Sequence, residues 1–374
     1  MAVIHPSFWR GRRVLITGHT GFKGSWLALW LTQMGAQVHG IALAPDTSPA
    51  LFNQLQLTSR LVSHHLIDIC DPEALVEVAA AAQPEVVLHL AAQPLVRRSY
   101  HDPLGTWATN VQGSLNVLEA LKPVHHPCAV VMVTTDKVYA NQDWDYGYRE
   151  CDRLGGHDPY SASKAAAELA TASWRASFCG EEGHQNPYLA IATARAGNVI
   201  GGGDWAEDRI VPDAMRSLAA HEAIPVRHPL ATRPWQHVLE PLGGYMRLAE
   251  QLFTAQASPR EPKEPAHNRF ASAFNFGPAL EANRSVSELV EAALQHWPGS
   301  WRHQSNPNAP HEAGRLHLQI DKAHHQLGWQ PQWDFATTVA RTVAWYRAVH
   351  EGASPLTCCL ADLSAYQTQE AHGH

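Results

Sequence analysis

The stretch that decides the fold runs from Val14 to Gly24 and reads VLITGHTGFKG. It begins as a short apolar strand, breaks into a glycine-rich loop and continues into the apolar run Trp26 to Leu31, which predicts a helix. Gly18 would form the tight turn, Gly21 would let the backbone approach phosphates, and Gly24 would let the helix pack against the strand. The spacing is GxxGxxG rather than GxGxxG. Because this loop lies between a strand and a helix, it predicts a dinucleotide site at a helix N-terminus.

Composition limits the classes of protein that this chain can be. The 374 residues can bury a large core, and 45% of them are hydrophobic. A net charge of -7 without a long basic run argues against a nucleic-acid-binding protein. No apolar run approaches the roughly 18 to 20 residues that span a bilayer, and the N-terminus lacks the order of a signal peptide. We therefore expect a cytoplasmic protein with neither membrane nor nucleic acid as a partner.

The cysteines and histidines give no sign of a metal site. The six cysteines are scattered without a CxxC pair, which is typical of free thiols in a reducing compartment. The 24 histidines show no HxxxH or HExxH spacing. We therefore expect no bound metal.

Strand and helix patterns alternate over the first 200 residues. Apolar runs at 37–43, 66–69, 85–90, 129–134 and 189–194 predict strands, and helices are expected at 72–82, 102–121 and 160–178. This alternation predicts an α/β fold with a Rossmann-like, doubly wound parallel sheet.

The pattern changes after residue 198. We expect residues 8–198 to form the dinucleotide-binding Rossmann domain, and residues 199–350 to form mainly a smaller C-terminal substrate-binding lobe, interleaved with the sheet domain. Helices are expected in that lobe at 241–253, 286–297 and 335–350. The tail, 351–374, is poorly patterned and is expected to be mobile.

Residues at the carboxyl ends of the predicted strands are the candidates for cofactor contacts. A typical NAD site has an acid at the end of the second strand, but here Asp46 comes late, while His19 and Lys23 in the loop are cationic or potentially so. These residues leave NAD and NADP both open. Asp68 could bind the adenine amino group or simply cap a strand. The other candidates are Gly18, Gly21, Phe22, Gly24, Ile69, Leu90, Ala91, Ala92, Gln93 and Thr109.

Tyr160 and Lys164 form a Tyr-x-x-x-Lys pair at the start of the helix expected at 160–178. Four residues apart on a helix, both side chains share one face. A nearby ammonium lowers the pKa of a tyrosine, so Tyr160 could take a proton from a sugar hydroxyl as a hydride leaves. Lys164 could also hold the nicotinamide ribose. The alternative is ordinary helix packing, but the glycine loop makes the redox interpretation the stronger one.

Five segments carry a family resemblance: TGHTGFKG at 17–24, LHLAAQPLVRRSY at 88–100, TTDKVY at 134–139, YSASK at 160–164 and ARAGNVIGGGDW at 194–205. Together they resemble the extended short-chain dehydrogenase/reductases, and more narrowly the nucleotide-sugar 4,6-dehydratases. The segments GGGDWAEDRIVPD and RPWQHVLEPLGGY are similar to the CDP-glucose branch of that family. The resemblance runs from Phe8 to Ala348.

This resemblance implies NAD as the cofactor, with NADP less expected, and CDP-glucose as the substrate. Tyr160 would take the C4 hydroxyl proton as NAD+ takes the C4 hydride; water would then leave across C5–C6, and the hydride would return to C6. The product would be CDP-4-keto-6-deoxy-D-glucose, a precursor of deoxysugars in surface polysaccharide such as O-antigen. Relatives pair the helices at 102–121 and 160–178 in a dimer, so a homodimer is expected.

Thr135, Asp136 and Lys137 would carry the elimination by the same resemblance. Thr135 would hydrogen-bond the C4 oxygen, and Asp136 would protonate the leaving C6 hydroxyl. Lys137 stands where the dTDP-glucose dehydratases have a glutamate as the C5 base, so its amine must be neutral for part of the cycle. Burial, Lys164 and the nicotinamide cation would each depress its pKa. Alternatively, Lys137 only positions a water or neutralises the enolate.

The substrate candidates lie mainly after the predicted sixth strand. Arg209 and Arg233 are candidates for the diphosphate, because guanidinium groups pair with phosphate oxygens in a bidentate manner; a surface salt bridge is the alternative for each. The resemblance implies that Asn198 contacts the β-phosphate or sugar, and Arg195 either contacts substrate or braces its loop. The remaining candidates are Gln93 and two tryptophans suspected of lining the nucleotide pocket, Trp205 and Trp235.

Two other functions remain open. A nucleotide-sugar 4-epimerase shares the glycine loop, tyrosine and lysine, but it releases no water, so Asp136 and Lys137 argue against it. A non-catalytic NAD-binding regulator commonly lacks the tyrosine or the lysine, and this chain keeps both.

Overall fold

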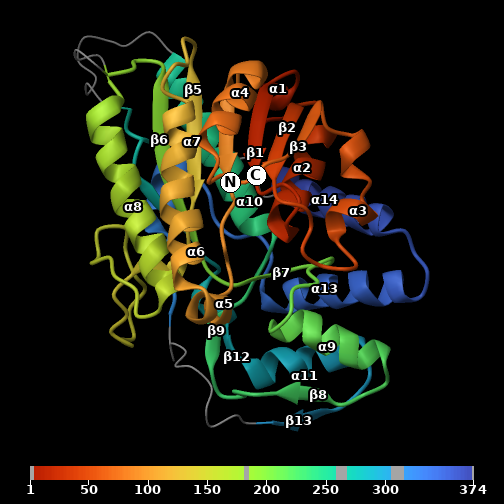
Figure 1. The fold of residues 1–374 in the computed structure, drawn as a ribbon. Helices are drawn as coiled ribbons and strands as arrows, with labels where there is room; N and C mark the ends of the chain where they lie inside the picture. Colours follow the sequence, from red (N-terminus) through yellow and green to blue (C-terminus); the bar gives the residue numbers. More distant parts are fainter. Residues whose placement is uncertain (1–3, 181–184, 258–267, 305–315, 373–374) are drawn as a thin grey trace.

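The centre of the molecule is a seven-stranded sheet in which every pair of neighbours is parallel (Figure 1). The computed structural model describes residues 4–180, 185–257, 268–304 and 316–372. The strand order is β11-β6-β5-β4-β1-β2-β3. These strands are β1 (Arg13–Thr17), β2 (Gln37–Ala42), β3 (Ser63–Leu66), β4 (Val86–His89), β5 (Cys128–Val133), β6 (Leu189–Ala196) and β11 (Ala273–Phe276). The order reverses beside β1, as in a doubly wound Rossmann-like sheet, so the predicted fold class is confirmed.

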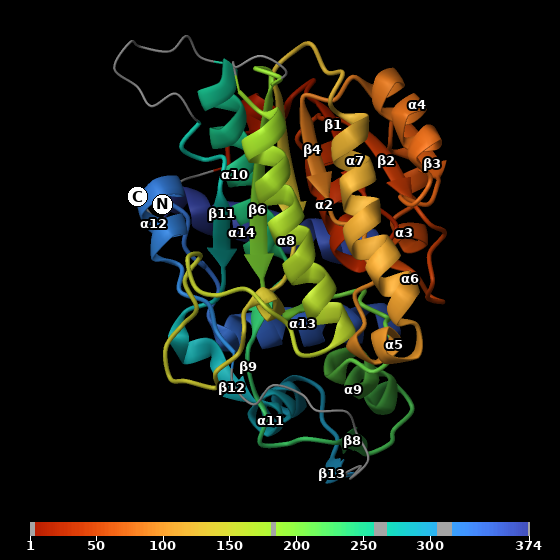
Figure 2. The same ribbon diagram turned by 60° about the vertical axis from the view of Figure 1, so that its left-hand side comes forward.

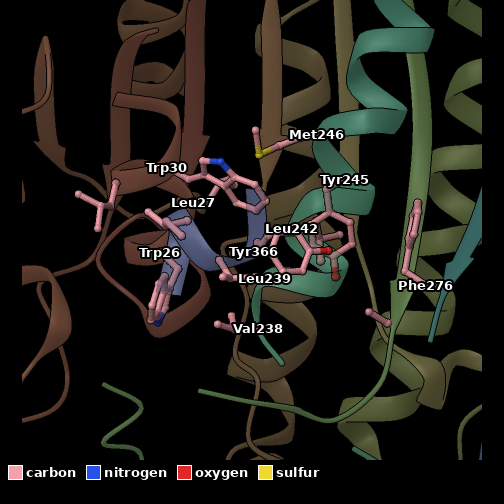
Figure 3. Packing of buried hydrophobic residues seen from close by; sticks show 14 of the residues in the cluster. Trp26, Leu27, Trp30, Val238, Leu239, Leu242, Tyr245, Met246, Phe276 and Tyr366 are labelled. Carbon is pink, nitrogen blue, oxygen red and sulfur yellow. The ribbon is translucent and has the colours of Figure 1, made fainter. Parts of the chain in front are cut away.

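Helices cover both faces of the sheet, and β1 shows why. Val14 and Ile16 belong to one hydrophobic cluster, whereas Leu15 between them belongs to another, because successive side chains of a strand point to opposite faces. The first cluster includes residues of α2 (Phe22–Gln33), α10 (Leu239–Ala257) and α14 (Pro355–His372), and Figure 3 shows part of it. The second includes residues of α4 (Pro72–Ala82) and α7 (Ser114–Ala120).

The C-terminal half of the chain contributes to two parts of the molecule. α10 and β11 belong to the sheet layers. Most other elements of this half gather beyond the carboxyl ends of the strands (Figures 1 and 2). Those elements are α9 (Ile210–Ala219), β8 (Ile224–Val226), β9 (Thr232–Pro234), β12 (Asn283–Ser285), α11 (Val286–His296), β13 (Trp301–His303) and α13 (Phe335–His350). The shorter elements are α1 (Pro6–Trp9), α3 (Leu51–Gln54), β7 (Val199–Ile200), β10 (Gln236–His237) and α12 (Asp321–Leu327). Within the described ranges, no helix has the length and apolarity needed to cross a membrane.

Two predicted elements near the sheet were misplaced. The third strand is β3 at Ser63–Leu66, three residues earlier than predicted, and residues 67–70 form the turn that follows. The helix expected at 102–121 is divided into α6 (Pro103–Trp107), a π-helical segment (Ala108–Gly113) and α7, after an unpredicted α5 (Val96–His101). In the π segment, the Asn110 amide donates to Ser163 Oγ of α8 (Pro159–Phe178) at 2.9 Å. The helix therefore departs from regular geometry where a polar side chain crosses to its neighbour.

The C-terminal tail is helical, which corrects the expectation of a poorly patterned segment. α14 buries Tyr366, whose hydroxyl donates to Glu240 of α10 at 2.9 Å. Its ring meets Trp30 of α2 edge to face, with 5.6 Å between centroids (Figure 3). Cys359 and Leu363 of α14 are buried in the same cluster as Tyr366, so several apolar side chains anchor this helix.

Candidate active site

The glycine loop joins β1 to α2, and the space around its glycines fits a dinucleotide phosphate. Gly18 has a φ of +77°, and a Cβ added there would lie 2.7 Å from the Ala91 nitrogen. A Cβ at Gly24 would collide with the Gly18 carbonyl oxygen. α2 begins after Gly21, and among the described residues no side chain caps it. Uncapped N–H groups at a helix N-terminus suit an anion.

The two basic residues of the loop lie in different surroundings. His19 is buried, with its Nε2 2.7 Å from Nδ1 of His64. Burial lowers its pKa to about 4, so His19 is neutral at pH 7 and adds no cation to the loop. The pKa of Lys23 is lowered to about 8, mainly by burial. The charge of Arg209 contributes to this lowering, and that of Asp136 opposes it. Lys23 therefore lies within electrostatic range of Arg209 and Asp136, which the motif alone did not reveal.

The residues expected near the adenine follow β3. Asp68 is exposed, and its Oδ1 accepts a hydrogen bond from the Cys70 nitrogen at 2.9 Å, which is a capping contact. Ile69 is buried, and its carbonyl oxygen accepts from Asn116 Nδ2 at 3.0 Å. Thr109 lies on the π-helical segment and hydrogen-bonds Cys70, which lowers the thiol pKa against the larger effect of burial.

The carboxyl end of β4 lies against the glycine loop. The Leu90 nitrogen donates to the Thr17 carbonyl oxygen at 3.0 Å, and the Ala91 nitrogen to Thr17 Oγ1 at 3.2 Å. Ala92 follows and is half-buried. The Gln93 side chain exchanges hydrogen bonds with the backbone of Leu95 in the same loop. Phe22 is half-buried at the start of α2. The hydrogen bonds of Leu90 and Ala91 with Thr17 thus join the carboxyl end of β4 to the start of the glycine loop.

The predicted catalytic residues come together where β5 ends. Thr135 Oγ1 donates to Asp136 Oδ1 at 3.0 Å and also hydrogen-bonds Tyr160. Asp136 is 2% exposed, and its Oδ2 has no hydrogen-bond partner within the described part of the chain. Burial raises its pKa, against the opposing charge of Lys137 and the hydrogen bond from Thr135. Lys137 is half-buried in a single helical turn, with its nitrogen 3.4 Å from Thr135 Oγ1.

The pKa of Tyr160 differs from the sequence-based expectation. Burial raises it to about 12, whereas a lowering by Lys164 was predicted. The Lys164 ammonium instead donates to the Val133 carbonyl oxygen at 2.9 Å, and burial lowers its own pKa to about 8. A hydrogen bond from Thr135 and the charge of Arg209 lower the pKa of Tyr160, but burial outweighs both.

A buried ionic network beneath this centre was missed by sequence analysis. Glu168, one turn after Lys164 on α8, accepts hydrogen bonds from Thr134 Oγ1 at 2.5 Å, Thr193 Oγ1 at 2.7 Å and Arg195 Nη2 at 2.8 Å. Burial would raise the pKa of Glu168, but Arg195 and these hydrogen bonds hold it below its usual value. Arg195 Nη1 also donates to the Tyr139 hydroxyl at 2.8 Å. Both amine groups of Arg195 therefore bind protein atoms, which favours the bracing role over substrate contact.

Two arginines act on the same centre from the C-terminal part of the chain. Arg209 Nη1 lies 2.8 Å from Asp204 Oδ2 and lowers the pKa of Tyr160. Arg233, on β9, is 8% exposed and lowers the pKa of Asp136. The two guanidinium groups therefore lie within electrostatic range of the proton-transfer residues.

The two suspected tryptophans pack within the protein. Trp235 is buried, and its Nε1 donates to the Arg284 carbonyl oxygen at 3.0 Å. Trp205 meets Tyr346 edge to face, with 5.2 Å between ring centroids. These contacts favour structural roles for both. Asn198 is half-buried directly after β6, at the carboxyl edge of the sheet.

These features define an extended short-chain dehydrogenase/reductase: a doubly wound sheet, a glycine loop, a Tyr-x-x-x-Lys pair and a buried acid beside that pair. Within that class, the chain belongs to the GDP-mannose 4,6 dehydratase family, whose model matches residues 15–342. It is 45% identical to the CDP-glucose 4,6-dehydratase of Salmonella typhimurium, over 98% of this chain and 99% of that protein. It is 23% identical to the dTDP-glucose 4,6-dehydratase of Haemophilus influenzae, over 89% and 97% of the two chains. The predicted family relation is confirmed.

Solved structures share the fold. A dTDP-glucose 4,6-dehydratase of Streptomyces venezuelae with NAD and TYD bound gives a TM-score of 0.73 at 23% identity, covering 92% of this chain and 99% of that one. A UDP-glucose 4-epimerase of Thermotoga maritima gives 0.73 at 19% identity, covering 90% and 99%. At such identities the likeness shows the fold and does not separate dehydratase from epimerase.

Proposed function

We propose that this chain is an NAD-dependent dehydratase that converts CDP-D-glucose to CDP-4-keto-6-deoxy-D-glucose. The observation that carries the proposal is Asp136, a buried carboxyl group with a raised pKa beside Tyr160. A raised pKa keeps a carboxyl group protonated long enough to donate a proton. A 4-epimerase expels no hydroxyl and has no use for such an acid. The cytidine nucleotide is proposed from the 45% identity with the Salmonella relative.

The proposed cofactor is NAD. Gly18, Gly21 and Gly24 would hold its pyrophosphate, and Lys164 would hold the nicotinamide ribose. NADP requires a cation for its 2′-phosphate, and the neutral, buried His19 supplies none. When bound, NAD+ accepts the C4 hydride of the sugar and later returns it to C6.

Tyr160 is proposed to take the proton from the C4 hydroxyl, while Thr135 holds the C4 oxygen. With a pKa of about 12 the phenol is protonated at pH 7, so its strength as a base depends on the positive charges around it. Arg209 already lowers that pKa, and the Lys164 ammonium lies on the same helical face. A positive charge near Tyr160 stabilises the phenolate, which must form before Tyr160 can accept the sugar proton and return to the phenol.

Elimination is assigned to Asp136 and Lys137. The ketone at C4 acidifies the C5 hydrogen, and Lys137 removes that proton. Asp136 gives its proton to the C6 hydroxyl, which leaves as water. Lys137 then returns a proton to C5. The protein ends in its starting protonation state once Tyr160 has released the proton taken from the C4 hydroxyl and Asp136 has regained one from solvent.

The test is turnover of CDP-glucose in deuterated water with NAD+ added. We expect a 4-keto-6-deoxy product with solvent deuterium at C5. A C4 epimer would instead indicate an epimerase, and no turnover with any of the CDP-, dTDP- and GDP-linked hexoses would favour a regulator.

Two variants separate the proposed roles. Asp136→Asn should still oxidise C4 but should accumulate the 4-keto hexose with its C6 hydroxyl in place, because no acid expels it. Lys137→Ala should lose C5 exchange with solvent. If C5 exchange persists in Lys137→Ala, the base assignment is wrong.

We further infer a homodimer formed through α6, α7 and α8, which lie side by side (Figures 1 and 2). Leu104 and Leu169 on these helices are 82% and 62% exposed, as expected for a face that another subunit covers. Sedimentation that shows only monomer at micromolar concentration would contradict this assembly.

The cellular role follows from the product class. The six cysteines form no disulfide, which supports the proposed cytoplasmic location. We propose that the 4-keto-6-deoxy product is consumed in deoxysugar synthesis for surface polysaccharide such as O-antigen.

A further inference from the structure

Three charged side chains from distant parts of the chain meet between the sheet and the C-terminal elements. Asp208 Oδ1 accepts from Arg227 Nη1 at 2.7 Å and from Arg97 Nη1 at 3.1 Å. Arg97 lies on α5, which follows the carboxyl end of β4, and Arg227 directly follows β8. α9 begins at Ile210, two residues after Asp208. We name these three residues the rim triad.

The backbone at Asp208 is held in a conformation that side chains rarely adopt. Its φ is +62°, in the left-handed region, which costs a non-glycine residue on the order of 1 kcal/mol or more. Aspartate tolerates this region better than most residues. The contacts with Arg97 and Arg227 therefore stabilise the left-handed backbone conformation of Asp208.

The next residue is Arg209, which connects the rim triad to the chemistry. Its guanidinium binds Asp204 at 2.8 Å and influences Tyr160. Because Asp208 and Arg209 are adjacent, the turn that directs the Asp208 carboxylate to the two arginines also sets the direction of Arg209. A change of φ at Asp208 would swing Arg209 relative to Tyr160.

The charges of the rim triad require one another. Both guanidinium groups contact the same carboxylate oxygen, so without Asp208 two like charges would face each other at short range. Arg227 has a second, longer contact of 3.7 Å with Asp213. The hydrogen bond from Arg227 holds the pKa of Asp208 below its usual value, so the carboxylate stays ionised at neutral pH.

We propose that Asp208 is a positioning residue for the dehydratase reaction, which ties α5 and β8 to the segment 204–209 so that Arg209 meets the substrate diphosphate. This inference rests on the proposed function. The rim triad is half-exposed, so it adds little to the stability of the fold. Its main effect should fall on substrate binding and should weaken with added salt.

The first test compares Asp208→Asn with a matched control, Glu351→Gln, which removes the carboxylate of an exposed pair with Arg347 at 2.9 Å. Asp208→Asn should raise KM for CDP-glucose about tenfold, since loss of two such contacts corresponds to roughly that factor. Its kcat should stay within about twofold of wild type, and its KM should lose most of its dependence on sodium chloride. Glu351→Gln should leave KM, kcat and salt dependence unchanged. An unchanged KM in Asp208→Asn would overturn the proposal.

A second variant separates positioning from loss of structure. Arg97→Met, which removes one of the two arginine contacts of Asp208, should raise KM by a smaller factor than Asp208→Asn, and Arg97→Lys should raise it less than Arg97→Met. The Asp208→Asn/Arg97→Met double variant should be no worse than Asp208→Asn alone, because Asp208→Asn already removes the contact with Arg97. Fully additive effects would overturn the proposal.

Hydrogen exchange distinguishes failure of this inference from failure of the proposed function. In Asp208→Asn, amides in segments 96–101 and 204–210 should exchange faster, while those in β5 should not change. Faster exchange in a protein that does not turn over CDP-glucose would retain the rim triad and reject the proposed substrate. If wild type turns over CDP-glucose but neither exchange nor KM changes in the variant, the proposed function is retained and the positioning role of Asp208 is rejected.

Discussion

Two ionic clusters border the catalytic centre, one buried beneath β5 and β6 and one half-exposed at the rim. In the buried cluster, the side chains of Glu168 and Arg195 are 3% and 4% exposed. In the rim triad, Asp208 is 49% exposed and its two arginines are about one-third exposed. The distances within the two clusters are similar, so the difference between them is access to water.

Access to water decides what each cluster can do. A buried charge that loses its partner stays in a medium of low dielectric, so the pair acts as a rigid unit. A charge at the rim can exchange its partner for water or for a substrate phosphate at little cost. The comparison indicates that the buried cluster forms a fixed floor, which holds Thr134 next to Thr135. The rim triad is adjustable, and we propose that it lies beside the charged part of the substrate.

The largest effect is expected from breaking the buried cluster. Arg195→Met removes the partner of a fully desolvated carboxylate and should destabilise the fold by about 3–5 kcal/mol. Urea unfolding measures this change. The double variant Glu168→Gln/Arg195→Met should recover part of the loss, because it leaves no uncompensated charge. A loss below about 1 kcal/mol in the single variant would mean that the floor is hydrated like the rim.

Acid should have the next largest effect, on a buried group that belongs to neither cluster. His19 in the glycine loop has a folded pKa of about 4 against about 6.5 in an unfolded chain. The unfolded chain therefore binds the proton first, so the contribution of His19 to stability is lost as the pH falls below 6.5. From pH 7 to pH 5 the loss should be about 2 kcal/mol. His19→Asn should show a correspondingly smaller fall, and an equal fall in both proteins would contradict a buried, neutral His19.

Sequence patterns predicted the segments whose structure depends on residues close together in the chain. The glycine loop and Thr135 to Lys137 were found because each forms one short segment at the end of one strand. The sheet strands before residue 200 were found because each is a continuous apolar run. Only β3 was misplaced, where His64 and His65 interrupt the apolar pattern that was expected.

The missed features all depend on contacts between residues far apart in sequence. Glu168 meets Thr193 from the next strand, 25 residues away, and Tyr366 meets Glu240 at a separation of 126 residues. The raised pKa of Tyr160 likewise results from its burial in the folded protein. No local spacing encodes such contacts, so the sequence indicated which residues gather at the site but not how their charges are compensated.

An intermediate case sharpens the comparison. Asp204 is buried, with 5% of its side chain exposed, while its partner Arg209 is 35% exposed. Asp204→Asn should therefore destabilise the fold by about 1 kcal/mol, more than a surface pair and less than the buried cluster. It should also weaken binding of CDP more than binding of cytidine, because the freed Arg209 no longer has a fixed position for the diphosphate. Thermal unfolding and calorimetric titration provide the two measurements, and equal weakening for both ligands would argue against a diphosphate role for Arg209.

The smallest effect is expected where both partners are exposed and no ligand is near. Lys122 and Glu119 pair at 3.1 Å on α7 and the turn that follows it, with 34% and 55% of their side chains exposed. Glu119→Gln should change the free energy of unfolding by at most about 0.5 kcal/mol, since such helix pairs contribute little and are screened by salt. A change that is small at low salt and smaller still at high salt would place this pair below the rim triad. A change above about 1 kcal/mol would show that exposure alone does not rank these ion pairs, and the contrast between floor and rim would then need another cause, such as the number of hydrogen bonds that each carboxylate accepts.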